Sequence, residues 1–189
     1  YDIELFQEGY YLDKIKISTE AYGFRKYFAY RTFKAEGEKG NEIARGNALF
    51  MLIDTEKRKM IRIGEEITNA YGIPPEETNR QVAFEKIQEI ETVHNEMEFQ
   101  VRYTDIDTNG HVNNVKYLDW LIEAIPPEII NEKSLRRIKM DYIKECLYGE
   151  TITSRVQLIE EKGTRAIKAI HSIINEEEKE VTRGETYWR

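Results

Sequence analysis

The sequence predicts an α+β fold in which a curved antiparallel sheet wraps around one long helix, and it predicts two such units in tandem. Three observations support this prediction: stretches that alternate polar and apolar residues, one apolar stretch with helical spacing, and an internal repeat. At 189 residues the chain could form one large domain or two small ones, so the repeat rather than the length decides between them.

The first half of the chain is expected to form strands joined by turns. Gly37 and Gly40 indicate a hairpin between the second and third strands. Residues 64–72 predict a short helix that ends at Gly72. The three predicted strands are residues 13–18, residues 27–33 and an apolar run expected to be buried, residues 48–53.

The second half is expected to follow the order strand, helix and four strands. A strand over residues 97–103 leads into the turn-forming residues 105–110. A helix over residues 114–125 comes next, and Pro126 and Pro127 end it. Its apolar positions, at helical spacing, are Val115, Leu118, Ile122 and Ile125. The four following strands are residues 138–147, 150–159, 164–174 and 181–189.

The internal repeat relates the strands of the two halves. YLDKI at residues 11–15 resembles YGETI at residues 148–152, which lies 137 residues further on. EIARG at residues 42–46 resembles EVTRG at residues 180–184, which lies 138 residues further on. Because the offset is nearly constant, duplication is favoured over chance. One curved sheet around one helix is the hotdog arrangement, so the repeat predicts a tandem hotdog. The first copy of the helix would precede residue 1, so we expect the first unit to lack its helix through truncation, disorder or deletion.

Composition, charge and domain organisation limit the classes of function that the protein can have. The predicted organisation is an N-terminal unit over residues 1–72, a partly helical linker over residues 73–95 and a C-terminal unit over residues 96–189. A net charge of −7 disfavours nucleic acid and anionic membranes as partners. The longest apolar run has six residues, whereas a membrane span needs about 20. A single cysteine, Cys146, excludes an internal disulfide and fits a cytoplasmic location.

The densest set of functional groups is DIDTNGHVNN, residues 105–114, directly before the predicted helix. A turn of Asp, Asn and Gly with an Asn cap explains most of this composition, but it does not explain His111. A helix N-terminus can polarise a carbonyl, and a carboxylate beside an imidazole supplies general base and general acid. The cluster therefore predicts a hydrolytic site.

The stretch VRYTDIDTNGHVNNVKYLDW, residues 101–120, closely resembles the signature of the acyl-acyl carrier protein (acyl-ACP) thioesterases of plants and bacteria. A Glu-Cys pair 34 residues beyond His111 matches a second element of that family, and DKIKI (13–17) and ARGNALFMLID (44–54) extend the resemblance to the first half. The resemblance implies a tandem hotdog that releases free fatty acid from acyl carrier protein, with its phosphopantetheine-linked acyl chain, and so terminates fatty acid biosynthesis. It also implies a catalytic C-terminal half and an N-terminal half that shapes the acyl pocket.

Carried over by position, the catalytic residues implied by the resemblance are Asp107, Asn109, His111 and Glu145, with Cys146 in a papain-like scheme. Asp107 would act on the thioester carbonyl directly or through a water, Asn109 and His111 would orient and polarise, and Glu145 would activate the hydrolytic water. In a strand, alternation lets only one of Glu145 and Cys146 face the site, and we expect Cys146 to be a buried, inert thiol. No cofactor or metal is expected.

Two other functions remain open from the sequence. One is an acyl-CoA thioesterase, because the same centre would act on a bond common to both carriers, and the other is a non-catalytic hotdog that binds acyl thioesters. Two basic clusters are candidate docking points for an acidic carrier protein: Lys57, Arg58, Lys59 and Arg62, and Arg136, Arg137 and Lys139. A homodimer is compatible with the exposed sheet edges that such a fold leaves.

Overall fold

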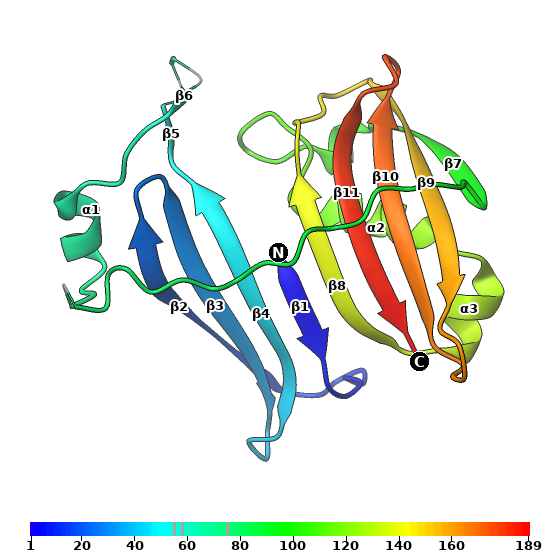
Figure 1. Cartoon of the computed structure of the whole chain (residues 1–189), viewed down its shortest axis with the longest axis horizontal. Helices are drawn as coiled ribbons and strands as arrows, with labels where there is room; N and C mark the ends of the chain where they lie inside the picture. The colour runs from blue at the N-terminus through cyan, green and yellow to red at the C-terminus, as the bar shows by residue number, and fades with distance from the viewer. Residues whose placement is uncertain (55, 58, 75) are drawn as a thin grey trace. The chain divides into compact units, whose positions relative to one another are not determined.

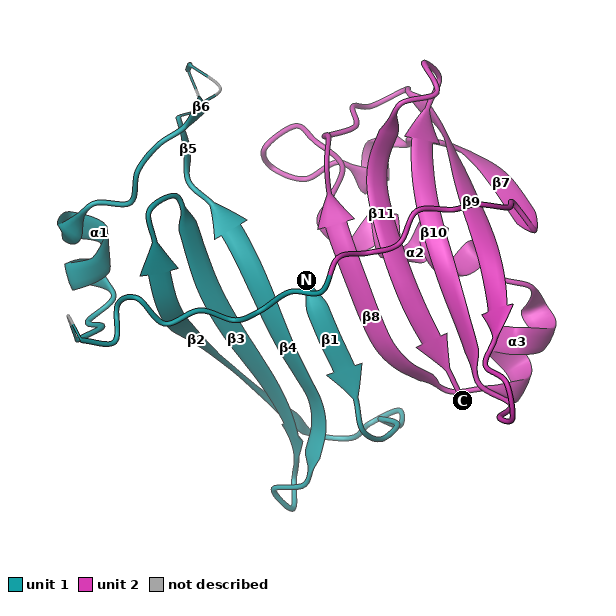
Figure 2. Ribbon diagram, in the orientation of Figure 1, with its two compact units in different colours: residues 1–85 teal, residues 86–189 magenta. Residues whose placement is uncertain are grey.

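The computed structural model describes residues 1–54, 56, 57, 59–74 and 76–189. These residues form two compact units, unit 1 (Tyr1–Glu85) and unit 2 (Lys86–Arg189), which Figure 2 colours separately. The division falls inside the stretch expected to be a linker, and the last part of that stretch belongs to unit 2.

Unit 1 contains an antiparallel sheet with the strand order β2-β3-β4-β1 (Figure 1). The three predicted strands and the hairpin are confirmed, and Gly40 takes the positive φ of 77° that the turn between β3 and β4 needs. The predicted short helix is also confirmed, with Gly72 at a φ of 66° just beyond it. The elements are β1 (Asp2–Leu5), β2 (Ile15–Arg25), β3 (Phe28–Gly37), β4 (Glu42–Met51), β5 (Ile53–Asp54), β6 (Lys59–Met60) and α1 (Glu65–Ala70).

Two expectations for unit 1 are wrong. The run 48–53 was expected to be buried, but only Ala48 is. Alternate side chains of β4 point to opposite faces of the sheet, and Leu49, Phe50 and Met51 are exposed. The connector after α1 contains no helix among its described residues. Its backbone groups bond to the sheet instead: the Phe24 N–H, for example, donates to the Thr78 carbonyl oxygen (2.6 Å).

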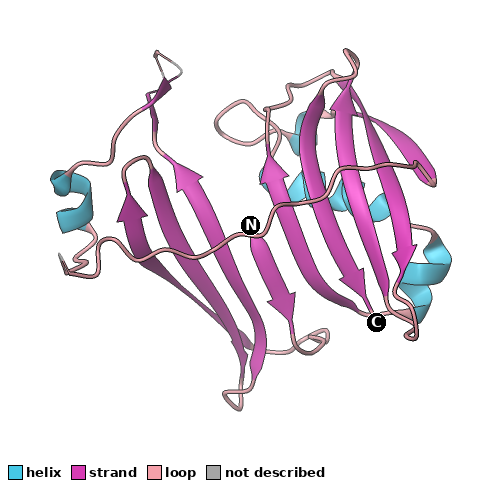
Figure 3. Ribbon diagram, viewed as in Figure 1, coloured by secondary structure: helices cyan, strands magenta, loops and turns pink. Residues whose placement is uncertain are grey.

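Unit 2 contains a five-stranded antiparallel sheet with the order β8-β11-β10-β9-β7 and helices on one side of it (Figure 3). The predicted order of strand, helix and four strands is confirmed. A second helix starts at Pro127, at the proline pair that ends the first one. The elements are β7 (Asn95–Gln100), the 3₁₀ turn η1 (Tyr103–Asp105), α2 (Asn114–Glu123), α3 (Pro127–Glu132), β8 (Leu135–Tyr142), β9 (Thr151–Glu160), β10 (Ile167–Asn175) and β11 (Glu180–Trp188).

The buried face of helix α2 differs in part from the predicted one: Ile125 is buried as expected, but Leu118 and Ile122 are only half-buried. Val115, expected to be apolar and inward, is 61% exposed. The buried side chains of this segment are Tyr117, Trp120, Leu121, Ala124 and Ile125. Gly184 allows the close approach, because a Cβ there would lie 2.9 Å from Leu121 Cδ1. The aromatic residues and Gly184, which the aliphatic pattern omits, thus set the orientation of the helix.

The two units repeat one design. The strand order β2-β3-β4-β1 in unit 1 corresponds to β9-β10-β11-β8 in unit 2, and both repeated sequence pairs lie at matching places in these strands. In unit 2 the sheet wraps around α2, so the predicted fold class, an antiparallel sheet around a helix, is confirmed.

Candidate active site

A tight turn presents the first three predicted site residues. The Asp107 N–H donates to the His111 carbonyl oxygen (2.8 Å), and the Gly110 N–H donates to the Asp107 carbonyl oxygen (3.1 Å). Gly110 has a φ of 80°, a conformation that favours glycine. The turn therefore holds Asp107 and His111 at its two ends, directly before α2.

The Asp107 carboxylate is oriented by Asn109. Oδ1 accepts the Asn109 backbone N–H (2.8 Å), and Oδ2 accepts Asn109 Nδ2 (3.4 Å). Asp107 is half-buried and Asn109 is exposed. The carboxylate thus stays within reach of a substrate while its direction is fixed by its neighbour two residues on.

His111 contacts Glu145, which lies 34 residues further along the chain. His111 Nε2 lies 3.1 Å from Glu145 Oε2, and the two side chains are 29% and 48% exposed. A carboxylate only accepts hydrogen bonds, so in this contact the Glu145 carboxylate is the acceptor and the His111 ring nitrogen is the donor. The structure brings Asp107 to Asn109 and His111 to Glu145, as two pairs.

Cys146 lies inside unit 2 and not in the site. The strand expected over residues 138–147 ends at Tyr142, because the N–H groups of Ile143 and Lys144 both donate to the Val181 carbonyl oxygen and the regular ladder stops. The expectation that Glu145 and Cys146 lie on a strand is therefore wrong. Cys146 is fully buried, and burial raises the pKa of its thiol, which keeps it protonated.

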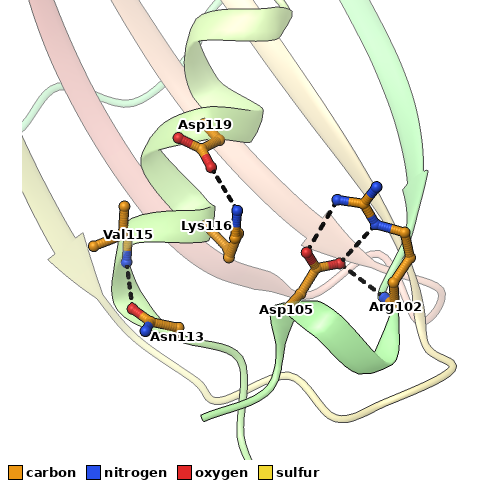
Figure 4. A network of polar contacts seen from close by, with 6 residues as sticks. All are labelled: Arg102, Asp105, Asn113, Val115, Lys116 and Asp119. Atoms are coloured by element: carbon orange, nitrogen blue, oxygen red, sulfur yellow. Dashed lines mark hydrogen bonds and ion pairs between the residues drawn. The ribbon is translucent and has the colours of Figure 1, made fainter.

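An ion pair between the exposed Arg102 and the buried Asp105 supports the turn, and neither residue was predicted to have this role. The Asp105 side chain is 1% exposed and accepts hydrogen bonds from Arg102 Nε (3.2 Å) and Nη2 (3.1 Å), as Figure 4 shows. Burial alone would raise the pKa of Asp105, but the hydrogen bonds and charge of Arg102 lower it. In the sequence, an arginine three residues before the aspartate is the pattern that indicates this ion pair.

The same residue joins the turn to the start of α2. The Asp105 carbonyl oxygen accepts the Asn113 N–H (2.8 Å), and Asn113 Oδ1 caps the helix by accepting the Val115 N–H (3.0 Å; Figure 4). The predicted Asn cap is confirmed at Asn113. The positive end of the α2 dipole is therefore directed at the region of the turn.

Unit 1 contains an apolar cavity of about 290 Å³ between its sheet and the segment that includes α1. The lining side chains include Phe24, Tyr30, Phe50, Ile63, Ile67 and Tyr71. The volume is at the lower end of the usual range for small-molecule pockets. Among the described residues no group of acidic, histidine and cysteine side chains is placed to hold a metal ion, and no helix there is long and apolar enough to cross a membrane.

The fold is that of a hotdog protein, and the candidate catalytic groups lie at the start of its helix. Two family models match the chain: "Acyl-ACP thioesterase C-terminal domain" over residues 87–189 and "Acyl-ACP thioesterase N-terminal domain" over residues 1–71. The chain belongs to the acyl-ACP thioesterase family.

Solved structures agree on the fold. A 12:0-ACP thioesterase from Umbellularia californica matches all of this chain and 70% of its own, with a TM-score of 0.86 and 22% identity. An acyl-ACP thioesterase from Bacteroides thetaiotaomicron matches all of this chain and 74% of its own, with a TM-score of 0.78 and 21% identity.

Curated relatives are longer than this chain. The oleoyl-acyl carrier protein thioesterase of Coriandrum sativum is 24% identical, and the match covers 99% of this chain and 59% of the relative. The palmitoyl-acyl carrier protein thioesterase of Cuphea hookeriana is 26% identical, and the match covers 79% of this chain and 37% of the relative. Both are named as chloroplastic, and the cytoplasmic location expected from the sequence stays a prediction.

Proposed function

We propose that this protein is a thioester hydrolase that releases free fatty acid from acyl-ACP and so terminates fatty acid biosynthesis. The observation that carries the proposal is the 3.1 Å contact between His111 and Glu145 beside the Asp107–Asn109 pair, at the start of α2. Membership of the acyl-ACP thioesterase family and the names of the relatives support the same reaction class.

In the proposed reaction, the thioester carbonyl carbon forms a new bond to oxygen and its bond to sulfur breaks. The oxygen comes from the Asp107 carboxylate, which gives an anhydride that water then opens, or from a water that Asp107 deprotonates. Asn109 and His111 orient the carbonyl, Glu145 activates the hydrolytic water, and the N-terminus of α2 stabilises the developing oxyanion. A proton removed from the water passes to the leaving sulfur, so the products are a fatty acid and the free thiol of the carrier.

The acyl chain is assigned to unit 1 and the chemistry to unit 2. The apolar cavity under α1 supports this division, because its lining of aromatic and aliphatic side chains suits a hydrocarbon chain. The length and saturation of the preferred chain follow from the depth of this pocket and are left to the experiment.

The partner in this proposal is acyl carrier protein with its phosphopantetheine arm. Of the two basic clusters expected to dock it, one loses a member: Lys139 is buried and its Nζ lies 3.2 Å from Glu185 Oε2. Arg58, in the other cluster, lies outside the described residues. The remaining lysines and arginines of both clusters stay candidates, and a homodimer stays a prediction.

The test measures thiol release by the purified protein from acyl-ACP and acyl-CoA substrates with matched acyl chains of several lengths. We expect a higher kcat/KM for acyl-ACP and a loss of about 100-fold or more in the His111→Ala variant, the usual size of a general acid–base contribution. Faster hydrolysis of acyl-CoA would transfer the assignment to an acyl-CoA thioesterase. Tight binding of both substrates without turnover would indicate a non-catalytic binding protein.

A further inference from the structure

The loop that carries Glu145 is held on both sides of that residue. Before it, the N–H groups of Ile143 and Lys144 donate to the Val181 carbonyl oxygen, and after it comes Cys146. Beyond Tyr142 the chain leaves the sheet, and Ile143, Glu145 and Leu147 are all exposed. Cys146 alone among residues 143–148 is fully buried. The contacts of the Cys146 backbone therefore help to determine the position of Glu145, together with the Lys144 N–H bond on its other side.

Two hydrogen bonds hold the Cys146 backbone from opposite directions. Its N–H donates to Tyr117 Oη on α2 (3.0 Å), and its carbonyl oxygen accepts the N–H of Val112 (3.0 Å). Val112 directly follows His111, so the second bond ties the Glu145 loop to the His111 turn. The first bond ties the same loop to the helix, which makes Cys146 a junction of three segments.

Tyr117 is itself held rigidly. The side chain is almost completely buried, and its ring lies 5.5 Å from the rings of Trp120 and Tyr142 in edge-to-face contacts. Burial and a hydrogen bond with the Cys146 side chain raise the pKa of Tyr117 far above its ordinary value, so the hydroxyl stays neutral. A neutral phenol can accept the Cys146 N–H and donate its own proton at the same time.

We propose that Tyr117 is a positioning residue for hydrolysis, whose hydroxyl keeps Glu145 against His111 through the backbone of Cys146. The inference rests on the proposed function for its meaning in the reaction, but the contact it describes can be tested without activity. It also gives Cys146 a role that needs no nucleophilic thiol: a small buried side chain at a backbone junction.

The test is a double-mutant cycle with Tyr117→Phe and Glu145→Gln. Tyr117→Phe keeps the ring and removes only the hydroxyl, and we expect kcat to fall about 10-fold with KM changed less than about 2-fold, since small displacements of catalytic groups cost rate. In the Glu145→Gln background the same substitution should change kcat by less than about 2-fold, because Tyr117 acts through Glu145. Equal losses in both backgrounds would overturn the proposal.

Tyr142→Phe is the matched control, because its hydroxyl belongs to the same ring cluster but donates to the Asn114 carbonyl oxygen (3.0 Å). Its effect on kcat, whatever its size, should be the same with and without Glu145→Gln, and coupling as strong as that of Tyr117→Phe would contradict the assignment.

A crystal structure of the Tyr117→Phe variant separates this inference from the proposed function. We expect His111 Nε2 and Glu145 Oε2 to lie beyond hydrogen-bonding distance there, and an unchanged contact would overturn the inference even if the enzyme is active. If the wild-type protein hydrolyses neither thioester, the proposed function fails while this structural result still decides on Tyr117.

Discussion

The two units share one strand order but differ in what they bury. The core of unit 1 consists of apolar side chains such as Phe24, Tyr30 and Ala48. Every buried polar or charged residue in the described part of the chain belongs to unit 2: Asp105, Lys139, Ser154, His171, Thr182, Glu185 and Thr186. One sheet design has thus acquired a polar interior and the candidate catalytic groups in only one of its two copies.

The polar interior of unit 2 lies on both faces of its sheet. On the α2 side, His171 Nε2 bonds to Thr186 Oγ1 (2.8 Å). On the opposite face, crossed by residues 86–91 (Figure 1), the Glu185 carboxylate accepts the Gln88 N–H (2.9 Å) and pairs with Lys168 Nζ (2.9 Å). These groups stabilise unit 2 only in one protonation state, so the two units should respond differently to substitution and to pH.

The largest expected difference between the units is in catalysis. Asp107→Ala in unit 2 should lower kcat for acyl-ACP by about 1,000-fold or more, because it removes the carboxylate that attacks the thioester carbonyl carbon directly or through a water. Phe24→Ala in unit 1 enlarges the apolar cavity and should change the preferred acyl-chain length instead. Steady-state kinetics on a series of acyl-chain lengths measures kcat and the preferred chain length of both variants. A kcat loss in Phe24→Ala as large as that in Asp107→Ala would contradict the assignment of the acyl chain to unit 1 and the chemistry to unit 2.

The next difference concerns stability in acid. Burial lowers the pKa of His171 from 6.5 to about 3. Between pH 6.5 and pH 3 the unfolded chain therefore binds a proton at His171 and the folded chain does not, so the folded state loses stability as the pH falls. Burial alone would raise the pKa of Glu185, but hydrogen bonds from Tyr187, Gln88, Lys168 and Lys139 hold it at about 2, below 4.5. The stabilising effect of its carboxylate is therefore present above pH 4.5 and lost toward pH 2.

Unit 2 should accordingly lose about 3 kcal/mol or more of its unfolding free energy between pH 7 and pH 3, at about 1.36 kcal/mol per pKa unit. Both tryptophans, Trp120 and Trp188, lie in unit 2, so urea unfolding followed by tryptophan fluorescence reports on this unit. His171→Gln should flatten the decline between pH 6.5 and pH 3. An unfolding free energy that stays constant from pH 7 to pH 4 would contradict the neutral, buried His171.

A smaller difference should separate two equivalent glycines of the repeat. A Cβ at Gly184 would meet Leu121 Cδ1 at 2.9 Å and the Lys139 carbonyl oxygen at 3.0 Å, whereas at Gly46 the nearest atom is Ile3 Cγ1 at 3.3 Å. Gly184→Ala should cost about 1–3 kcal/mol by overpacking α2 on the sheet, and Gly46→Ala less than about 1 kcal/mol. Thermal unfolding of both variants checks this, and equal losses would show that α2 does not make the difference.

The smallest expected effect on catalysis is that of Cys146→Ala. The thiol is buried and protonated, and both backbone hydrogen bonds of residue 146 are kept by alanine. We expect kcat within about 3-fold of the wild type, since no thiolate nucleophile is lost. Loss of turnover comparable to that of Asp107→Ala, in a folded variant, would restore the papain-like scheme.

Local sequence determined the repeating part of the structure. Alternation, an aromatic-rich stretch and an apolar run predicted the strands of the first half, and Gly40 and Gly72 marked the turn and the helix end. Asn113 and the proline pair marked the ends of α2. Each of these features depends on residues close in sequence, whose backbone preferences act without help from the rest of the chain. The resemblance of residues 101–120 to one family then named the candidate site residues.

Tertiary structure alone decided how those residues meet. The end of β8 at Tyr142, the rotation of α2 toward Gly184, and the approach of Glu145 to His111 all join segments that lie far apart in sequence. Such contacts depend on how closely side chains pack and on where buried polar groups find partners, and neither quantity is encoded in a local pattern. For this chain, sequence determined the strands and the turn, and packing decided which carboxylate reaches His111.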